Sequence, residues 1–246
     1  MGCPVNLRVT CGIRLKPPQQ VTLNSFKMSK YLVTVARFEA FIHATKYKTD
    51  AERQGNSSIR NAKQDINGPG VNWRCNSAGK PYNEDEKKEF PVIYVSYNDA
   101  KQYCQWLSTK TGKSYRLPTE AEYEYAARGG NKSRGYRYAG GNGIDSVAWY
   151  IVNGGGTTHP VGLKQPNELG LYDMTGNVWE WCSDWFSLDY KTTPVENPQG
   201  ALTGTLRVRR GGSWYNTDVL SGPSVSLGNA PDYHGNFIGF RVVEDL

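Results

Sequence analysis

Apolar positions recur with a helical period in several parts of the chain. After Thr34, the apolar residues Val35, Phe38, Phe41 and Ile42 follow one another at spacings of three, three and one residues. This spacing places them on one face of a helix, so it predicts an amphipathic helix that begins after Thr34 and packs on the core.

Two further helices are indicated by capping patterns. Ser96 is followed three residues later by Asp99, and Thr119 is followed three residues later by Glu122. A hydroxyl residue with an acidic residue at this spacing can satisfy the free amides of a helical first turn. We expect the first of these helices to end at Gly112 and the second at residues 129–130.

Glu120, Glu122 and Glu124 could be taken for catalytic carboxylates. In the first turns of a helix, however, acidic residues complement the helix dipole, and Glu122 completes a capping box. We therefore interpret these residues as structural.

Short alternating or continuous apolar segments predict strands. These segments are residues 21–23 and 26–31, expected to form a hairpin, and residues 91–95, 160–162, 179–185, 206–214 and 238–243. Along 179–185, Trp179, Trp181 and Trp185 are expected to share one face. Residues 45–90 and 131–165 are polar or glycine-rich and are expected to be irregular, with a turn at 67–70 and Trp73 as a local anchor.

The segment between the last two expected strands is unusual in composition. Residues 215–238 have no helical or strand periodicity and contain no Lys, Glu, Gln, Met or Trp. An ordinary surface loop would normally include Lys or Glu. A long irregular segment held at both ends by strands more often carries function, so we expect a binding loop here.

Composition sets broad limits on the class of protein. The chain has 246 residues, which fits one large domain, and we expect a tail or first strand at 1–20 followed by one domain at 21–246. The net charge of +6 is scattered, so it does not favour nucleic acid as a partner. The mean hydropathy of −0.62 argues against a transmembrane segment.

The five cysteines fit no zinc-binding spacing, and their odd number does not indicate a closed set of disulfides. Cys104 lies on the apolar face of an expected helix and is interpreted as a buried thiol. Cys3 follows Gly2, as in a processed lipoprotein, so either a lipid anchor at Cys3 or an accidental terminal cysteine is compatible with the sequence.

A turn through Gly176 and Asn177 lies between Asp173 and Glu180. Two carboxylates with backbone carbonyls between them are hard oxygen donors of the kind that calcium prefers. The same residues could instead form a hydrogen-bonded turn, and the residues alone do not choose between the two.

Several motifs together resemble the formylglycine-generating enzyme, or sulfatase-modifying factor, family. They are residues 31–34, 91–100, 103–107, 115–130, 159–162, 170–181, 210–214 and 239–241. The resemblance implies an α+β, C-type-lectin-like fold with few helices, twisted antiparallel sheets and much irregular chain. It also implies a structural calcium site formed by the side chains of Asp173 and Glu180 and the carbonyls of Gly176 and Val178.

The catalytic centre of the family is not matched. The enzymes of this family use a pair of cysteines placed after the Gly-Gly-Ser element, but no cysteine follows Cys182 here. Copper thiolate chemistry requires those soft ligands. A second, iron-dependent branch needs a histidine cluster, whereas His43, His159 and His234 are isolated in the sequence. We therefore expect no enzyme activity and no catalytic metal.

A subset of the family fits better, namely the variable proteins of diversity-generating retroelements. In these proteins template adenines are randomised during copying, which diversifies the segment that follows Trp214. An AAC codon randomised at its two adenines becomes NNC, which cannot encode Lys, Glu, Gln, Met or Trp. These are the residue types that residues 215–238 lack.

We therefore predict a non-catalytic, receptor-like binding protein whose variable segment, about residues 214–238, contacts an unknown macromolecule, expected to be a protein. The predicted contact residues are Tyr215, Thr217, Asp218, Val219, Ser221, Ser224, Ser226, Asn229, Tyr233, His234 and Phe237. Rings supply contact area at low entropic cost, so Tyr215, Tyr233 and Phe237 are the expected anchors, with His234 beside them. We expect a monomer at the cell surface or outside the cell, with the cytoplasm as the alternative. The competing hypothesis is an oxidase of the family with a rearranged copper and thiol centre, for which the mid-chain candidates are Cys75, Cys104 and Cys182.

Overall fold

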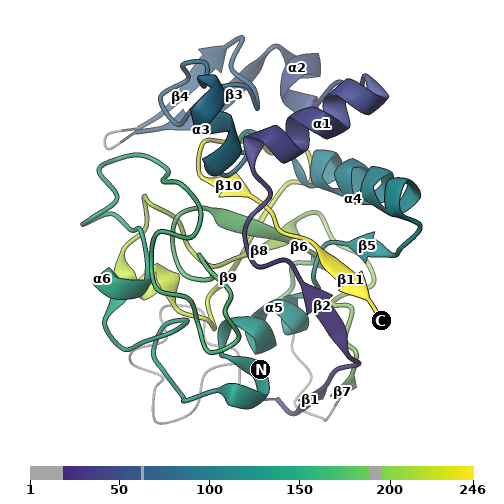
Figure 1. Cartoon of the computed structure of the whole chain (residues 1–246), viewed down its shortest axis with the longest axis vertical. Coiled ribbons are helices and arrows are strands. Elements are labelled where there is room, and N and C mark those ends of the chain that lie inside the picture. The colour runs from purple at the N-terminus through teal and green to yellow at the C-terminus, as the bar shows by residue number, and fades with distance from the viewer. Residues whose placement is uncertain (1–18, 62–63, 189–194) are drawn as a thin grey trace.

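The computed structural model describes residues 19–61, 64–188 and 195–246. Four helices gather at one end of the molecule, above the central strands in Figure 1, and a fifth lies on the opposite side of those strands. The first four are α1 (Val35–Thr45), α2 (Asp50–Gln54), α3 (Glu84–Glu89) and α4 (Tyr97–Thr111), and the fifth is α5 (Glu120–Ala127). Among the described residues, no helix combines the length and the apolar character needed to cross a bilayer.

The central sheet has the strand order β10-β6-β8-β9, and a second sheet has the order β2-β11-β5. The strands of the central sheet are β6 (Trp179–Trp185), β8 (Arg207–Arg210), β9 (Ser226–Asn229) and β10 (Ile238–Gly239). Those of the second are β2 (Phe26–Met28), β5 (Tyr115–Arg116) and β11 (Val243–Asp245). Two smaller sheets pair β1 (Val21–Thr22) with β7 (Val195–Glu196) and β3 (Asn56–Arg60) with β4 (Asp65–Pro69).

The three predicted helices are confirmed, and two of them have the predicted side-chain caps, whereas Thr34 precedes α1 without a side-chain cap hydrogen bond. Ser96 and Thr119 each accept a hydrogen bond from the backbone amide three residues on, and Asp99 and Glu122 accept from the amides of the capping residues. Gly112 ends α4 in the left-handed conformation. These boundaries follow from local sequence because each cap is formed within a few residues of chain.

Some predicted strands are wrong. Residues 21–23 and 26–31 form no hairpin, because β1 pairs with β7 and β2 pairs with β11. Residues 91–95 are buried but contain only an isolated bridge at Pro91, and Tyr94 has a positive φ of 57° that interrupts an extended strand. Residues 160–162 form a turn.

The segments expected to be irregular contain more structure than predicted. Residues 45–90 hold α2, α3 and the β3–β4 hairpin, and the expected turn at 67–70 is largely strand β4. Residues 131–165 contain the short helix α6 (Ile144–Val147). Residues 215–238 contain the 3₁₀ helix η3 (Asp218–Ser221) and strand β9, which pairs with β8. Only β9 among these depends on a strand outside its segment, because it pairs with β8. Helices α2 and α3 begin at local capping boxes, Thr49 with Glu52 and Asn83 with Glu86, which the polar composition of the segment obscured.

Large rings fill the core between the helices and the central sheet. Phe38 of α1 lies with its ring centroid 5.6 Å from that of Trp73 and 6.3 Å from that of Phe240. Trp179 and Trp181 belong to the same buried cluster, and Trp73 is only 1% exposed. Rings of this size bury much apolar area per residue, which suits a chain with short helices and strands.

Candidate functional site

The predicted metal turn is held by protein groups. The carboxylate of Asp173, only 3% exposed, accepts hydrogen bonds from the amide of Gly162 at 2.8 Å and from Nδ2 of Asn177 at 3.4 Å. Asn177 also bonds the backbone of His159 in both directions. These hydrogen bonds correspond to the hydrogen-bonded turn that the sequence gave as the alternative to a calcium site.

Glu180 is bound by an arginine. Its Oε2 accepts from Nε of Arg241 at 2.6 Å, and its Oε1 accepts from Nη2 of Arg241 at 3.0 Å and from the hydroxyl of Tyr123 at 3.0 Å. Burial raises the pKa of the Glu180 carboxyl, and the Arg241 charge opposes that rise.

These contacts decide whether calcium fits. A divalent cation beside Glu180 would lie next to the buried Arg241 guanidinium and would compete with three hydrogen bonds that the two Glu180 oxygens already accept. Within the described ranges, no three His, Cys, Asp or Glu side chains are grouped as metal ligands. The prediction of calcium at Asp173, Gly176, Val178 and Glu180 does not fit this donor set, and we derive no role for the ion.

The Gly-Gly-Ser element follows β8 and turns the chain sharply. Gly211 and Gly212 have φ values of 96° and 77°, and a Cβ on Gly212 would lie 2.7 Å from Oγ of Ser221. The turn is therefore restricted to glycine in both conformation and space. It delivers Trp214 to the core, where its indole donates a hydrogen bond to the carbonyl of Asn236.

A buried ion-pair network anchors the start of the predicted binding segment. Arg210 is fully buried, lies 2.6 Å from Glu124 and 3.6 Å from Glu120, and donates to the carbonyls of Pro223 and Val225. Glu120 and Glu124 are thereby engaged in a structural network, as the sequence indicated.

The predicted contact residues do not all face solvent. Thr217 and Val219 are exposed, and Tyr215, Asp218, Asn229 and Tyr233 are half-buried. Ser221, Ser224, Ser226, His234 and Phe237 are buried. For these five the expected solvent-facing role is wrong.

Specific contacts explain why these residues are buried. Ser226 lies in β9 opposite Arg210, and Ser221 lies against the glycine turn. Phe237 belongs to the main core cluster, with its centroid 5.9 Å from that of Tyr233. His234 packs against the β3–β4 hairpin, where its Nδ1 is 3.0 Å from Oγ of Ser57.

The structure also has a groove that the sequence did not predict. A hollow of about 410 Å³ lies between the β3–β4 hairpin and residues 230–234. Ser58 and Asp65 line the hairpin side, and Asp232 and Tyr233 line the other. The only sequence signal was the polar character of residues 45–90, which carries no information about this long-range contact.

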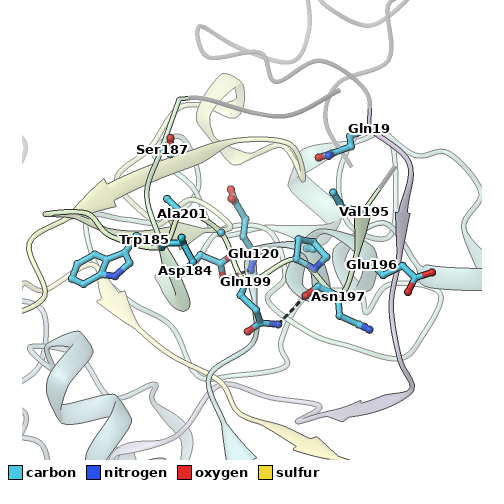
Figure 2. A pocket seen from close by; sticks show the side chains of 14 residues that line it. Gln19, Glu120, Asp184, Trp185, Ser187, Val195, Glu196, Asn197, Gln199 and Ala201 are labelled. Atoms are coloured by element: carbon cyan, nitrogen blue, oxygen red, sulfur yellow. Dashed lines mark hydrogen bonds between the residues drawn. The ribbon is translucent and has the colours of Figure 1, made fainter. Parts of the chain in front are cut away.

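A larger cavity of about 590 Å³ lies elsewhere, near α5. Figure 2 shows Asp184 and Trp185 on one side of it and Val195 and Asn197 on the other. Its two inner carboxylates are structural, since Asp184 accepts from the amide of Glu120 at 2.8 Å and Glu120 faces Arg210. We therefore place no catalytic function in this cavity.

The described cysteines do not form a pair. Cys75, Cys104 and Cys182 are free and buried, and they belong to three separate clusters of the core. Burial raises the pKa of Cys104 to about 12 and raises that of Cys182 well above its usual range. The rearranged thiolate centre at Cys75 and Cys104 is therefore unsupported. Cys3, with its suggested lipid anchor, and Cys11 lie outside the described residues.

Comparison with known proteins identifies the class. The α+β architecture of short helices and mostly antiparallel sheets is that of the formylglycine-generating and C-type-lectin-like folds, as predicted. The structure titled PvdO from Pseudomonas aeruginosa superimposes with a TM-score of 0.80 at 31% identity, covering 100% of this chain and 90% of that one. Treponema denticola variable protein 1 gives a TM-score of 0.73 at 24% identity, covering 94% and 88%, and shares the fold.

Residues 4–246 match the family model of the sulfatase-modifying factor enzyme 1-like domain, and the chain belongs to that family. It is 37% identical to a formylglycine-generating enzyme of Streptomyces coelicolor, over 93% of this chain and 81% of the relative. It is 34% identical to a Mus musculus relative named inactive C-alpha-formylglycine-generating enzyme 2, over 92% of this chain and 77% of the relative.

Proposed function

We propose that this chain is a non-catalytic binding protein built on the formylglycine-generating frame. The observation that carries the proposal is the position and burial of its cysteines. No cysteine follows Cys182, and the described cysteines are buried in separate clusters. A copper site of the family type needs two thiolates that approach each other. The relative named inactive is consistent with a family frame that persists without activity.

The proposed contact surface, which we call the variable face, consists of Tyr215, Thr217, Val219, Asp232 and Tyr233. Thr217, Val219 and Asp232 are exposed, and the two tyrosines are half-buried. The face is supported by rigid elements, because Trp214 and Phe237 lie in the core beneath it. Aromatic side chains on a rigid support provide contact area at low entropic cost.

A retroelement origin of the variable face is supported by the missing residue types in 215–238. The DNA downstream of the gene should contain a near-copy of the last hundred or so bases, differing only at adenines, beside a reverse-transcriptase reading frame. Their absence would remove the retroelement part of the proposal and leave the binding function open.

A library experiment tests the display role directly. Codons for Thr217, Val219 and Asp232 are replaced by NNC, and the folded fraction of variants is measured by protease resistance. We expect most variants to fold, because these side chains are exposed. A matched library at the buried positions Ser221, Ser226 and Phe237 should mostly fail. Equal failure of both libraries would contradict a display surface.

The competing oxidase hypothesis has its own test, because relatives carry the enzyme name. The purified full chain is titrated with copper(I), with and without thiol blocking, and is incubated with a cysteine-containing peptide under oxygen. We expect no thiol-dependent copper binding and no loss of the peptide thiol. Turnover would overturn the non-catalytic proposal.

A further inference from the structure

Two neighbouring arginines of β8 have opposite environments. Arg210 faces α5, where it pairs with Glu124 and Glu120. Because side chains alternate along a strand, Arg209 lies on the other face of the sheet. Its guanidinium carbon is 4.6 Å from the ring centroid of Trp179 and 5.4 Å from that of Phe237. Arg209 is thus stacked on the rings beneath the variable face.

Arg209 has no counter-charge in the part of the chain that the structure describes. It forms no ion pair there, and its Nε is buried with no hydrogen-bond acceptor. The fully buried Arg210 and Arg241, by contrast, are each matched by glutamate at 2.6 Å. Burial lowers the pKa of Arg209 to about 10, so the group is still charged at neutral pH. A largely desolvated cation without an anion is costly, and the fold elsewhere avoids that cost.

A second arginine, from the β3–β4 hairpin, also contacts the ring of Phe237. The guanidinium carbon of Arg60 is 5.0 Å from the ring centroid of Tyr215 and 5.9 Å from that of Phe237. Arg60 pairs with Asp65 across the hairpin, and its side chain is 30% exposed. Phe237 therefore has two guanidinium groups within 6 Å of its ring, while the described residues provide only Asp65 as an ion-pair partner.

We propose that Arg209, assisted by Arg60, binds a carboxylate of the ligand at the variable face, with Tyr215 and Tyr233 contacting an apolar or aromatic group beside it. The proposal rests on the binding function proposed above and names the chemistry of the ligand. A guanidinium stacked on a ring presents its N–H groups at its edge, which matches a planar carboxylate in a two-point hydrogen bond. The rings supply the apolar contact that gives such a site selectivity.

N-acetylphenylalanine is a suitable probe, and its amide is the matched neutral control. Binding to the full chain is measured by calorimetry and by the ¹⁵N shift of the arginine Nε–H signals. We expect millimolar binding of the acid that shifts the Arg209 signal, and at least tenfold weaker binding of the amide. Inorganic phosphate should bind more weakly than the acid, because it lacks the ring and the planar geometry.

Substitutions assign the site. R209Q should weaken binding of the acid at least tenfold, and R60Q should weaken it several-fold. R137Q is the control, because Arg137 pairs with Asp218 in η3 and lies outside the proposed site. If R209Q does not fold, the Arg209 signal of the unaltered chain and the R60Q variant still decide the result. Equal binding of acid and amide, tighter binding of phosphate, or an unchanged R209Q would overturn the proposal. The library experiment is independent of these outcomes and tests the binding surface itself.

Discussion

The protonation state of His234 can be worked out from its hydrogen bonds. The hydroxyl of Ser57 donates its only proton to the carbonyl of Val71 at 2.8 Å, so it must accept from Nδ1 of His234. The other nitrogen, Nε2, lies 3.2 Å from Oε1 of Gln54. Because Nδ1 already donates to Ser57, a neutral ring can only accept at Nε2, which requires the Gln54 amide to be turned so that its NH₂ faces the ring. Burial lowers the pKa of His234, which favours this neutral form.

The stability of the fold should therefore fall in mild acid. A histidine with a lowered pKa in the folded state contributes stability above its unfolded pKa of about 6.5, and that contribution is lost as the pH falls below it. We expect urea unfolding to show a larger loss of stability between pH 8 and 5.5 for the unaltered chain than for His234→Gln. An equal loss in both would show that His234 does not titrate with folding.

The Glu180–Arg241 pair gives a second prediction for single residues. Both side chains are fully buried, so Glu180→Gln leaves an uncompensated guanidinium and should cost about 3–5 kcal/mol in urea unfolding. Glu84→Gln is the control, because Glu84 is 82% exposed and its pair with Lys87 should contribute less than about 1 kcal/mol. A similar small cost at both positions would contradict the structural role of the pair.

The same pair predicts that calcium has no stabilising effect. Arg241 and Tyr123 bind the Glu180 oxygens that the ion would need. A ligand that binds only the folded state raises the melting temperature with its concentration. Melting curves in millimolar calcium and in chelator should therefore coincide. A rise of several degrees with calcium would restore the metal site that the family resemblance implied.

At the scale of elements, residues 215–238 contain both buried residues that stabilise the fold and exposed residues that are available for binding. Phe237 is 6% exposed and packs in the core, whereas Val219 in η3 is 38% exposed. Phe237→Ala should therefore cost about 3–5 kcal/mol. Val219→Ala should change stability by no more than about 0.5 kcal/mol. Urea unfolding of the two variants compares them, and a comparable loss for both would mean that η3 is part of the core.

The elements that could be predicted from sequence are those fixed by local interactions. The helices starting after Ser96 and Thr119 were predicted because the whole capping box lies within four residues. The pairing of β1 with β7 joins residues more than 170 positions apart, and no local pattern reports it. Arg209 was missed for the same reason. Its ring partners Trp179 and Phe237 come from two other parts of the chain, and only the assembled sheet shows that no described carboxylate pairs with the arginine.

At the scale of the whole molecule, the core is divided into separate clusters, and each described cysteine lies in a different one. Cys104 of α4 belongs to the aromatic cluster, Cys182 to the cluster that contains Tyr123, and Cys75 to the cluster that contains Ile93. All three are buried, and none is paired with another. All three thiols are shielded by burial, and burial also raises the pKa of Cys104 and Cys182, so we expect thiol chemistry at these positions only after unfolding.

This arrangement predicts how the thiols react. In a Cys3→Ser, Cys11→Ser variant, an Ellman-type disulfide reagent at pH 8 should leave Cys75, Cys104 and Cys182 unmodified while the protein is native. All three should react once urea unfolds the chain, at a rate that follows the unfolded fraction. The same variant unfolded in urea from the start serves as the positive control for the reagent. Fast modification of any of the three in the native variant would show an exposed thiol, and it would reopen the hypothesis of a rearranged catalytic centre.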